Sequence, residues 1–535
     1  MGAIVHKFGS DVLHRYVHFS VLDFVGSPAA YLRGYRRDWS AFKEMQYARD
    51  SGGVGFRRYV ETALLPIVID GTRLSDSYRV PKLGGAITAI GSTTIVLDRL
   101  GGLHRYDLAT GEFKRLSLPP LPNNVEAYFK LGALRIGLTD EHANNVFRTY
   151  GITFLSDRRE LAVAYDQFDA ASGMFKTAVS VIPMDTSTFT ATGNWQTIFI
   201  SDPYAPGAAF ASGGRMAYGK NGKLYLSVGD HMVAQAAQDL NSTFGKIIEI
   251  DIAANKWRVF TEGHRNPQGL TFLRSEQLLS TEHGPRGGDE LNIITEGSNY
   301  GWPNVTLGTE YESYDSNAAS ALVGSHDGYT PPLFAWVPSI GVSQVIELNN
   351  FHPRWDGDLL VASLKASSLY RLRLEHNRVL YSEPIWVGQR IRDLAQLEDG
   401  TIVMWTDDTQ LLSIRVDFDQ LAQNRRSPDV VSDATVYECM GCHHFGKTNP
   451  GDYAPTLSNL LNRRIASDDF RYSQGLRAKE GAWTEARLAK FLSNPAAFAN
   501  GTNMPDLGLS EGEIKDIVKT LISATDTPAD TASNR

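Results

Sequence analysis

The sequence predicts a mostly β fold, a six-bladed β-propeller followed by a small all-α domain. Short apolar runs of four to eight residues recur through most of the chain and are separated by Gly, Asn and Asp, as expected for strands joined by turns. These runs form six strand–turn–strand units over about 340 residues, which is typical of a propeller with variable loops. The six units are 86–97, 151–164, 215–228, 270–280, 343–362 and 393–406. A pair of β-sandwiches remains the alternative.

Changes in composition along the chain predict its division into parts. The polar stretch around Pro428 lacks periodicity and is expected to be a linker. The first 80 residues are rich in aromatic side chains and Arg and follow neither pattern. The predicted parts are an extension packed on the propeller (1–80), the propeller (81–424), a linker (425–432), a helical domain (433–525) and a flexible tail (526–535).

Composition excludes several classes of protein. The chain has 535 residues, of which 42% are hydrophobic and 21% charged, as in globular proteins. Its net charge is -8 and it has no long run of like charge, which argues against a nucleic-acid partner. No apolar run approaches the ~18 residues that a membrane span needs. Two cysteines exclude a disulfide-based scaffold.

Those two cysteines form the motif CMGCH, residues 439–443. In a C-x-x-C-H motif the thiols of Cys439 and Cys442 add to the vinyl groups of a haem, and His443 becomes the proximal iron ligand. A chance C-x-x-C or a redox dithiol is the alternative. Met504 lies downstream in GTNMP, residues 501–505, where a distal ligand is expected.

Helical patterns accompany this motif. Ser510 and Glu513 form a capping box before a helix whose apolar face carries Ile514, Ile517, Val518 and Leu521. A second amphipathic stretch covers 483–492. The segment 430–525 therefore resembles a class I cytochrome c, with a covalent haem c and with His443 and Met504 on its iron. His444, beside the motif, is expected to be a surface residue.

The haem motif also bears on localisation. Haem attachment of this kind takes place outside the cytoplasm, so we expect a periplasmic or otherwise exported protein. Residues 1–9 lack the apolar region and the cleavage site of a signal peptide. A signal or anchor that has been removed is the expected explanation.

Three strings in the β-rich part carry a second resemblance. They are HRNPQGL (264–270), EHGPRGGDELN (282–292) and NYGWP (299–303). Over residues 84–416 the chain resembles the soluble pyrroloquinoline quinone (PQQ) dehydrogenases. It is closest to their aldose sugar dehydrogenase branch, and the soluble glucose dehydrogenases are more distant. The resemblance implies a propeller that binds PQQ and Ca²⁺.

PQQ is a flat ortho-quinone with three carboxylates, and guanidinium groups match carboxylates well. The resemblance implies that the cofactor contacts are Arg265, Asn266, Lys365, Arg390 and Arg392, with Trp336 near an aromatic wall. Ca²⁺ would make the quinone electrophilic, held partly by the backbone carbonyls of Gly284 and Pro285. Taken singly, these residues could form surface ion pairs or an ordinary turn. Their joint order favours the cofactor site.

The chain departs from the family pattern at two places. The family's catalytic His falls on Ala211, in ASGGR (211–215), and a cofactor-contacting Gln is missing around TYGIT (149–153). Hydride transfer from an alcohol needs a base for the hydroxyl proton, and its loss costs roughly 10²–10⁴-fold. Candidate replacements are His231, His264 and His283, with Asp230 and Glu262 as carboxylate options. An unusual substrate or a loss of activity are the other possibilities.

The sequence thus predicts a PQQ- and Ca²⁺-dependent dehydrogenase for an aldose-like sugar, an alcohol or an aldehyde. Electrons would pass from PQQ to the haem and then to an external acceptor. The alternative is a catalytically inactive propeller that binds a ligand or transfers electrons together with the cytochrome. A propeller that serves only protein interaction is disfavoured, because partner binding does not require the cofactor cations.

Overall fold

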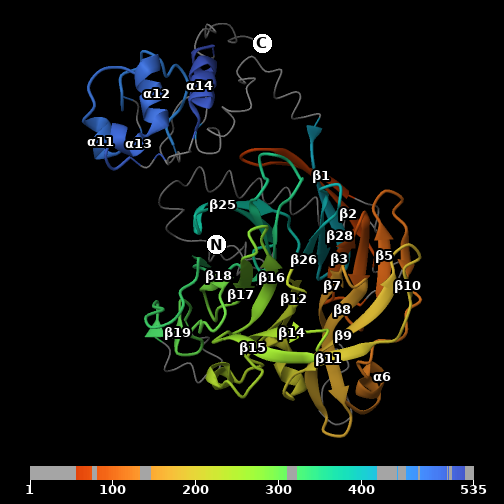
Figure 1. Ribbon diagram of the computed structural model, residues 1–535. Coiled ribbons are helices and arrows are strands. Elements are labelled where there is room, and N and C mark those ends of the chain that lie inside the picture. The colour runs from red at the N-terminus through yellow and green to blue at the C-terminus, as the bar shows by residue number, and fades with distance from the viewer. Residues whose placement is uncertain are drawn as a thin grey trace, which may run out of the picture. The chain divides into compact units, whose positions relative to one another are not determined.

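The computed structural model describes residues 56–74, 81–132, 146–309, 322–418, 443, 454–467, 470, 472–502, 504 and 509–523. Within these residues the chain forms a propeller of six large sheets and a separate set of short helices near the C-terminus (Figure 1). The predicted six-bladed propeller with a helical C-terminal region is therefore confirmed.

Each of the first three blades is an antiparallel sheet of consecutive strands. Blade 1 contains β3 (Ala86–Ile90), β4 (Thr93–Leu97), β5 (Leu103–Asp107) and β6 (Phe113–Arg115). Blade 2 contains β7 (Thr149–Leu155), β8 (Glu160–Asp169), β9 (Met174–Asp185), β10 (Thr190–Ala191) and β11 (Gln196–Ile200). Blade 3 contains β12 (Gly213–Tyr218), β13 (Leu224–Val228), β14 (Lys246–Asp251) and β15 (Lys256–Glu262).

Blades 4 and 5 follow the same plan. Blade 4 contains β16 (Pro267–Phe272), β17 (Leu278–Glu282), β18 (Asp289–Ile294) and β21 (Phe334–Trp336). A small pair of strands, β19 (Val305–Thr306) and β20 (Leu322–Val323), precedes β21. Blade 5 contains β22 (Val342–Glu347), β23 (Leu359–Ser363), β24 (Ser368–Glu375) and β25 (Arg378–Trp386). Short helical turns lie between strands at α6 (Val125–Ala127), η1 (Tyr128–Gly132), η2 (Pro206–Ala211) and η3 (Ala234–Gln238).

The sixth sheet combines the two ends of the propeller sequence. Its order is β1-β2-β28-β27-β26, with β26 (Ile391–Gln396), β27 (Ile402–Thr406), β28 (Gln410–Val416), β2 (Pro66–Arg73) and β1 (Phe56–Glu61). Strands from residues 56–73 thus complete a blade that the end of the propeller begins. Apolar side chains of blades 1 and 6, among them Ile87, Val96 and Trp405, share one buried cluster and close the ring.

The first strand of each blade lines the central axis, and these strands pack on one another in a closed ring. In the described blades, five of the six first strands have a β-bulge at their beginning. A bulge leaves a residue out of the ladder and turns its side chain in a new direction. The residues left out include Tyr150 in β7, Arg215 in β12, Gln268 in β16 and Arg392 in β26.

A buried ion pair joins four blades at this end of the ring. The Arg215 guanidinium lies 2.7 Å from the Asp393 carboxylate and also donates to the backbone carbonyls of Gln268 (3.0 Å) and Arg392 (2.6 Å). The same oxygen of Asp393 accepts a hydrogen bond from the backbone N–H of Ile87, at 2.8 Å. Both side chains are almost wholly buried, so each charge is stabilised mainly by the opposite charge of its partner.

The helical unit contains α11 (Gln474–Arg477), α12 (Glu485–Ser493), α13 (Pro495–Phe498) and α14 (Glu511–Ser523). The predicted capping box before α14 is confirmed, because the Glu513 carboxylate accepts from the backbone N–H of Ser510 at 2.8 Å and Ser510 Oγ accepts from the N–H of Glu513. Helix α12 begins at Glu485, two residues later than the pattern indicated. Trp483 instead packs in the core of this unit.

None of the helices in the described ranges is both long enough and apolar enough to cross a membrane.

We predict that Arg215→Met destabilises the propeller by roughly 3–5 kcal/mol, because it leaves the Asp393 carboxylate buried and unpaired. The measurement is the midpoint of denaturant unfolding, followed by near-ultraviolet circular dichroism. Arg105→Met is the control: its exposed pair with Glu112 should be worth less than about 1 kcal/mol. Equal midpoints for the two variants would contradict the central role of the buried pair.

Candidate functional site

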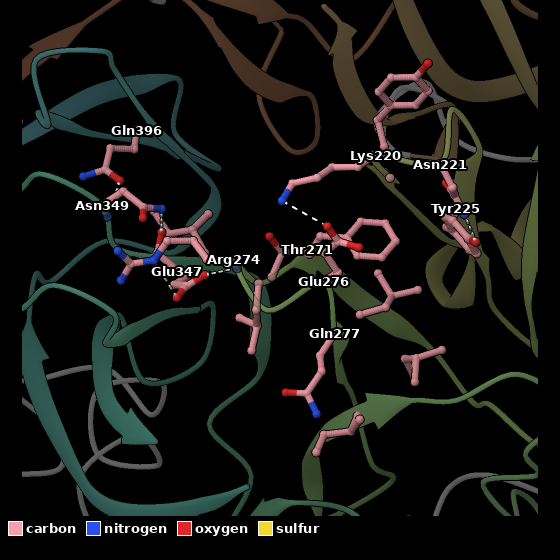
Figure 2. Close-up of a pocket in the computed structure, with 18 of the residues that line it drawn as sticks. Lys220, Asn221, Tyr225, Thr271, Arg274, Glu276, Gln277, Glu347, Asn349 and Gln396 are labelled. Carbon is pink, nitrogen blue, oxygen red and sulfur yellow. Dashed lines mark hydrogen bonds and ion pairs between the residues drawn. The ribbon is translucent and has the colours of Figure 1, made fainter. Parts of the chain in front are cut away.

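Two cavities lie at opposite ends of the first strands. The larger, about 1160 Å³, is lined by the turns that follow β12, β16, β22 and β26. Figure 2 shows that its two cationic side chains each pair with a carboxylate: Lys220 lies 3.1 Å from Glu276, and Arg274 lies 3.2 Å from Glu347. Glu296 and Glu398 also line this cavity, so its carboxylates outnumber its cations and it does not favour an anionic ligand.

The smaller cavity, about 270 Å³, lies where the first strands begin, and every blade contributes to it. Its size is close to the lower end of small-molecule pockets, roughly 300–1,000 Å³. One residue from each blade in order is Gly85, Tyr150, Arg215, Gln268, Leu364 and Arg392. Four of these six are residues left out of the ladder by a bulge, so the bulges aim the polar side chains into the cavity.

Positive charge dominates this cavity. Arg148, Arg390 and Arg392 line it, with Asp407 as the carboxylate among the lining residues. Asp407 accepts from Arg390 Nε at 2.9 Å and from Arg392 Nε at 2.8 Å. Burial alone would raise the pKa of Asp407, but the two guanidinium groups outweigh it and lower this pKa to about 2. Asp407 is therefore a fixed anion that holds the two arginines in position.

Arg148 adds a further guanidinium, which lies over the ring of Phe210 at 4.7 Å. Burial lowers the pKa of Arg148, and the like charge of Arg392 lowers it further. An anion in the cavity would oppose both effects, because its negative charge stabilises the buried Arg148 guanidinium and offsets the repulsion from Arg392. The cavity therefore suits a ligand with several carboxylates, and its residues fit PQQ.

Only some of the predicted cofactor contacts line the cavity. Arg390, Arg392 and Asn266 line the cavity. Lys365 follows the lining residue Leu364, but it is exposed and is not itself among the lining residues. Trp336 is buried in the outer strand β21 of blade 4 and is not among the lining residues.

Arg265 is not among the residues that line the cavity, and its contacts bear on the predicted calcium site. Its guanidinium donates to the carbonyl of His283 at 3.2 Å and to that of Gly284 at 2.9 Å. The Gly284 carbonyl, a predicted Ca²⁺ ligand with that of Pro285, is thus hydrogen-bonded to a cation. Because Arg265 already engages that carbonyl, it is not a ready calcium ligand in this structure, and we assign no step to calcium.

The candidate bases differ in whether they reach the cavity. His231 is buried and stacks on Tyr204, and its backbone N–H donates to the carbonyl of Ala211 at 3.1 Å. Burial lowers the pKa of His231 to about 3. His264 is buried with both ring nitrogens bonded, to Glu282 at 2.9 Å and to Thr261 at 2.8 Å. Neither of these two histidines lines the cavity.

His283 does line the cavity, and its Nε2 bonds to the carbonyl of Val342 at 2.5 Å. Ala211, at the predicted position of the family's base, ends the turn η2 and is buried. The carboxylate options lie elsewhere: Asp230 accepts from the indole N–H of Trp302 at 2.9 Å, and Glu262 accepts from Asn299 at 3.2 Å.

Several lining residues escaped the sequence reasoning. Arg148, Tyr150, Ser212, Gln268 and Asp407 line the cavity but were not predicted as site residues. Gln268 lies within a recognised motif, so the motif carried a signal for it. Tyr150 lies where the Gln-containing loop of the family pattern is absent. This absence is the sequence feature that could have pointed to Tyr150.

The helical unit contains part of the predicted haem site. His443 Nδ1 lies 2.7 Å from the Pro455 carbonyl, which fixes the ring tautomer and leaves Nε2 for a metal. Met504 is partly buried against the core of this unit. Cys439, Cys442 and His444 lie outside the described residues. His443 and Met504 fit a haem with His and Met ligands.

We predict that Asp407→Asn has a lower free energy of unfolding than wild type near pH 5, and that this difference shrinks by about 2 kcal/mol on acidification. The pKa of Asp407 is lowered, so its contribution is complete above its ordinary value of about 4 and is lost as the pH falls toward 2. Urea unfolding of both proteins between pH 5 and pH 2.5 measures this difference. A pH-independent difference would contradict the assignment.

We predict that Met504→Ala leaves a covalent haem but lowers its reduction potential, because Met ligation raises the potential. The measurements are the pyridine haemochrome spectrum, which reports the covalent haem, and a spectroelectrochemical titration. Met404→Ala, a buried methionine in β27 of the propeller, is the control and should leave the potential unchanged. An unchanged potential in Met504→Ala would exclude Met504 as a ligand.

Comparisons with known proteins identify the family of each part of the chain. The model of the family "Glucose / Sorbosone dehydrogenase" matches residues 137–413. "Aldose sugar dehydrogenase YliI" of Escherichia coli is 31% identical over 214 residues, which are 37% of this chain and 57% of that protein. The chain spans 57–60% of the length of the first three curated relatives of the propeller.

A solved structure shows the same fold, and a curated relative covers the helical unit. The apo-form of the soluble aldose sugar dehydrogenase from Escherichia coli has a TM-score of 0.52 at 23% identity, over 65% of this chain and 99% of that one. "Cytochrome c2" of Afifella marina is 33% identical over 103 residues, 18% of this chain and 83% of that protein. The chain therefore belongs to the glucose/sorbosone dehydrogenase family and carries a C-terminal segment of the cytochrome c family.

Proposed function

We propose that this protein oxidises a hydroxyl or aldehyde group of a small molecule, an aldose-like sugar in the first instance, with PQQ as the primary electron acceptor. Electrons then pass to a c-type haem in the same chain and on to an external acceptor. The observation that carries the proposal is the arginine-lined cavity where the first strands begin.

The side chains around this cavity have separate roles in the proposal. Arg390 and Arg392 bind carboxylates of the cofactor, and Asp407 holds both guanidinium groups in place. Arg148 provides a further positive group, and its stacking on Phe210 limits the guanidinium's freedom. PQQ, when bound, supplies a quinone that takes two electrons from the substrate.

The helical unit supplies the second redox step in this proposal. Cys439 and Cys442 attach the haem, and His443 and Met504 ligate its iron. Holding both redox centres in one chain keeps the haem at a high effective concentration for the first transfer. Because such haems are attached outside the cytoplasm, we also propose that the protein is exported.

A second candidate is a propeller that binds a ligand or transfers electrons but does not catalyse. Ala211 favours it, because alanine cannot accept the proton that the family's His would take. The two candidates differ in turnover and share cofactor binding, so one experiment separates them.

We predict that the oxidised haem becomes reduced when PQQ and a suitable substrate are both present. The measurement is the haem absorbance during addition of sugars, alcohols and aldehydes, with and without PQQ. Calorimetry measures PQQ binding in parallel, and Arg390→Gln/Arg392→Gln should weaken it by at least tenfold, since each lost charge-assisted bond is worth roughly 1.5–3 kcal/mol.

Lys220→Gln is the matched control, because Lys220 lies in the larger cavity at the other end of the axis. It should leave PQQ binding unchanged. PQQ binding without haem reduction by any substrate would favour the second candidate. Absence of PQQ binding would overturn both.

A further inference from the structure

We propose that Tyr150, acting with Asp166, accepts the hydroxyl proton of the substrate in place of the missing histidine. This inference rests on the proposed function and names the proton acceptor of the same site. Tyr150 is the catalytic residue in this arrangement, and Asp166 acts through it.

The bulge at the start of β7 places Tyr150. Thr149 pairs with Tyr165 and Gly151 pairs with Ala164, so Tyr150 is left out of the ladder. Tyr150 lines the arginine-rich cavity, and its phenol donates to Asp166 Oδ1 at 2.5 Å. A side chain at the cavity wall is thereby connected to a carboxylate that is fully buried.

The two departures from the family pattern meet at this point. Tyr150 replaces the missing loop, and it packs against the glycines that follow Ala211. A Cβ at Gly214 would lie 2.2 Å from the Cβ of Tyr150, so only glycine permits this approach. The hydroxyl of Ser212, which also lines the cavity, contacts the phenol. The space beside the missing histidine thus holds a different ionisable pair.

Asp166 is suited to receive a proton. It accepts hydrogen bonds from the Tyr204 phenol and, at 2.8 Å, from the backbone N–H of Arg148. Burial raises the pKa of Asp166 to about 7, although the bonds from Tyr150 and Tyr204 and the charge of Arg148 each lower it. Tyr128 also faces this carboxylate. Burial raises the pKa of Tyr128, and the charge of Asp166 raises it further.

The groups behind these residues do not compete for the proton. His231 stacks on Tyr204, and burial keeps it neutral. The pKa values of Tyr150 and Tyr204 are raised well above the ordinary value, first by burial and then by Asp166. Neither tyrosine therefore ionises by itself near neutral pH, and the carboxylate is the group that changes charge.

The chemical step balances as follows. The substrate O–H bond breaks and its proton passes to Tyr150 Oη, while the Tyr150 O–H proton passes to the Asp166 carboxylate. The adjacent C–H bond breaks and a hydride, carrying two electrons, leaves to an ortho-quinone oxidant. The substrate carbon becomes a carbonyl, Tyr150 is again a neutral phenol, and Asp166 holds the proton until it returns to solvent.

The kinetic test compares wild type, Tyr150→Phe and Asp166→Asn in the full chain reconstituted with PQQ. We expect each substitution to lower kcat by roughly 10²–10⁴-fold, as for loss of a positioned base. In wild type, kcat should rise with pH and level off above about pH 7, because Asp166 must be ionised to accept the proton. Asp166→Asn should lack this rise.

Two further variants separate catalysis from structure. Tyr204→Phe removes a bond that stabilises the Asp166 carboxylate, so the rise in kcat should move to higher pH. Tyr165→Phe is the matched control. Tyr165 is a buried tyrosine next to Asp166 on β8, hydrogen-bonded to Ser180 at 2.7 Å, and its substitution should leave kcat unchanged.

A second readout needs no turnover. Infrared spectroscopy of the protein without PQQ should show a protonated carboxyl band that disappears with a midpoint near pH 7 and is absent from Asp166→Asn. Wild-type kinetics in Asp166→Asn, or no such band in wild type, would overturn this inference alone. A wild type that binds PQQ but turns over no substrate would overturn the proposed function and this inference with it.

Discussion

The buried pair of Arg215 and Asp393 is the constraint on which the propeller and its cavity both depend. Burial lowers the pKa of the arginine and raises that of the aspartate, and each partner opposes that shift in the other. The pair joins backbone groups of blades 1, 4 and 6 to a side chain of blade 3. Because a buried charge without its partner is costly, the blades keep a fixed relative position at this end of the axis.

That fixed frame explains how a repetitive fold builds a specific site. The repeated β-bulges turn one residue from each of several first strands toward the axis, and their side chains meet although the blades are distant in sequence. Asp407 then orients the two arginines of blade 6, whereas in the larger cavity at the other end both lining cations are paired with carboxylates. An excess of fixed cations at one end favours a polyanionic ligand there.

The two predicted departures from the family pattern, at Ala211 and around Tyr150, are spatial neighbours. In the sequence they look independent of each other. In the fold, Tyr150 packs on Gly214 and bonds to Asp166, so the two changes form one local environment. The helical unit meanwhile keeps a hydrogen bond that prepares His443 to bind a metal through its other nitrogen.

The sequence by itself determined the features that depend on neighbours along the chain. Strand alternation, the capping box of Ser510 and Glu513 and the C-x-x-C-H motif each span a few residues, so their signals are local. Only the tertiary structure decided which side chains face the cavity: Arg148 and Tyr150 do, Trp336 does not, and Arg265 is turned to the Gly284 carbonyl. The physical reason is distance along the chain, since Arg215 contacts Arg392 across 177 positions and no local pattern encodes such a contact.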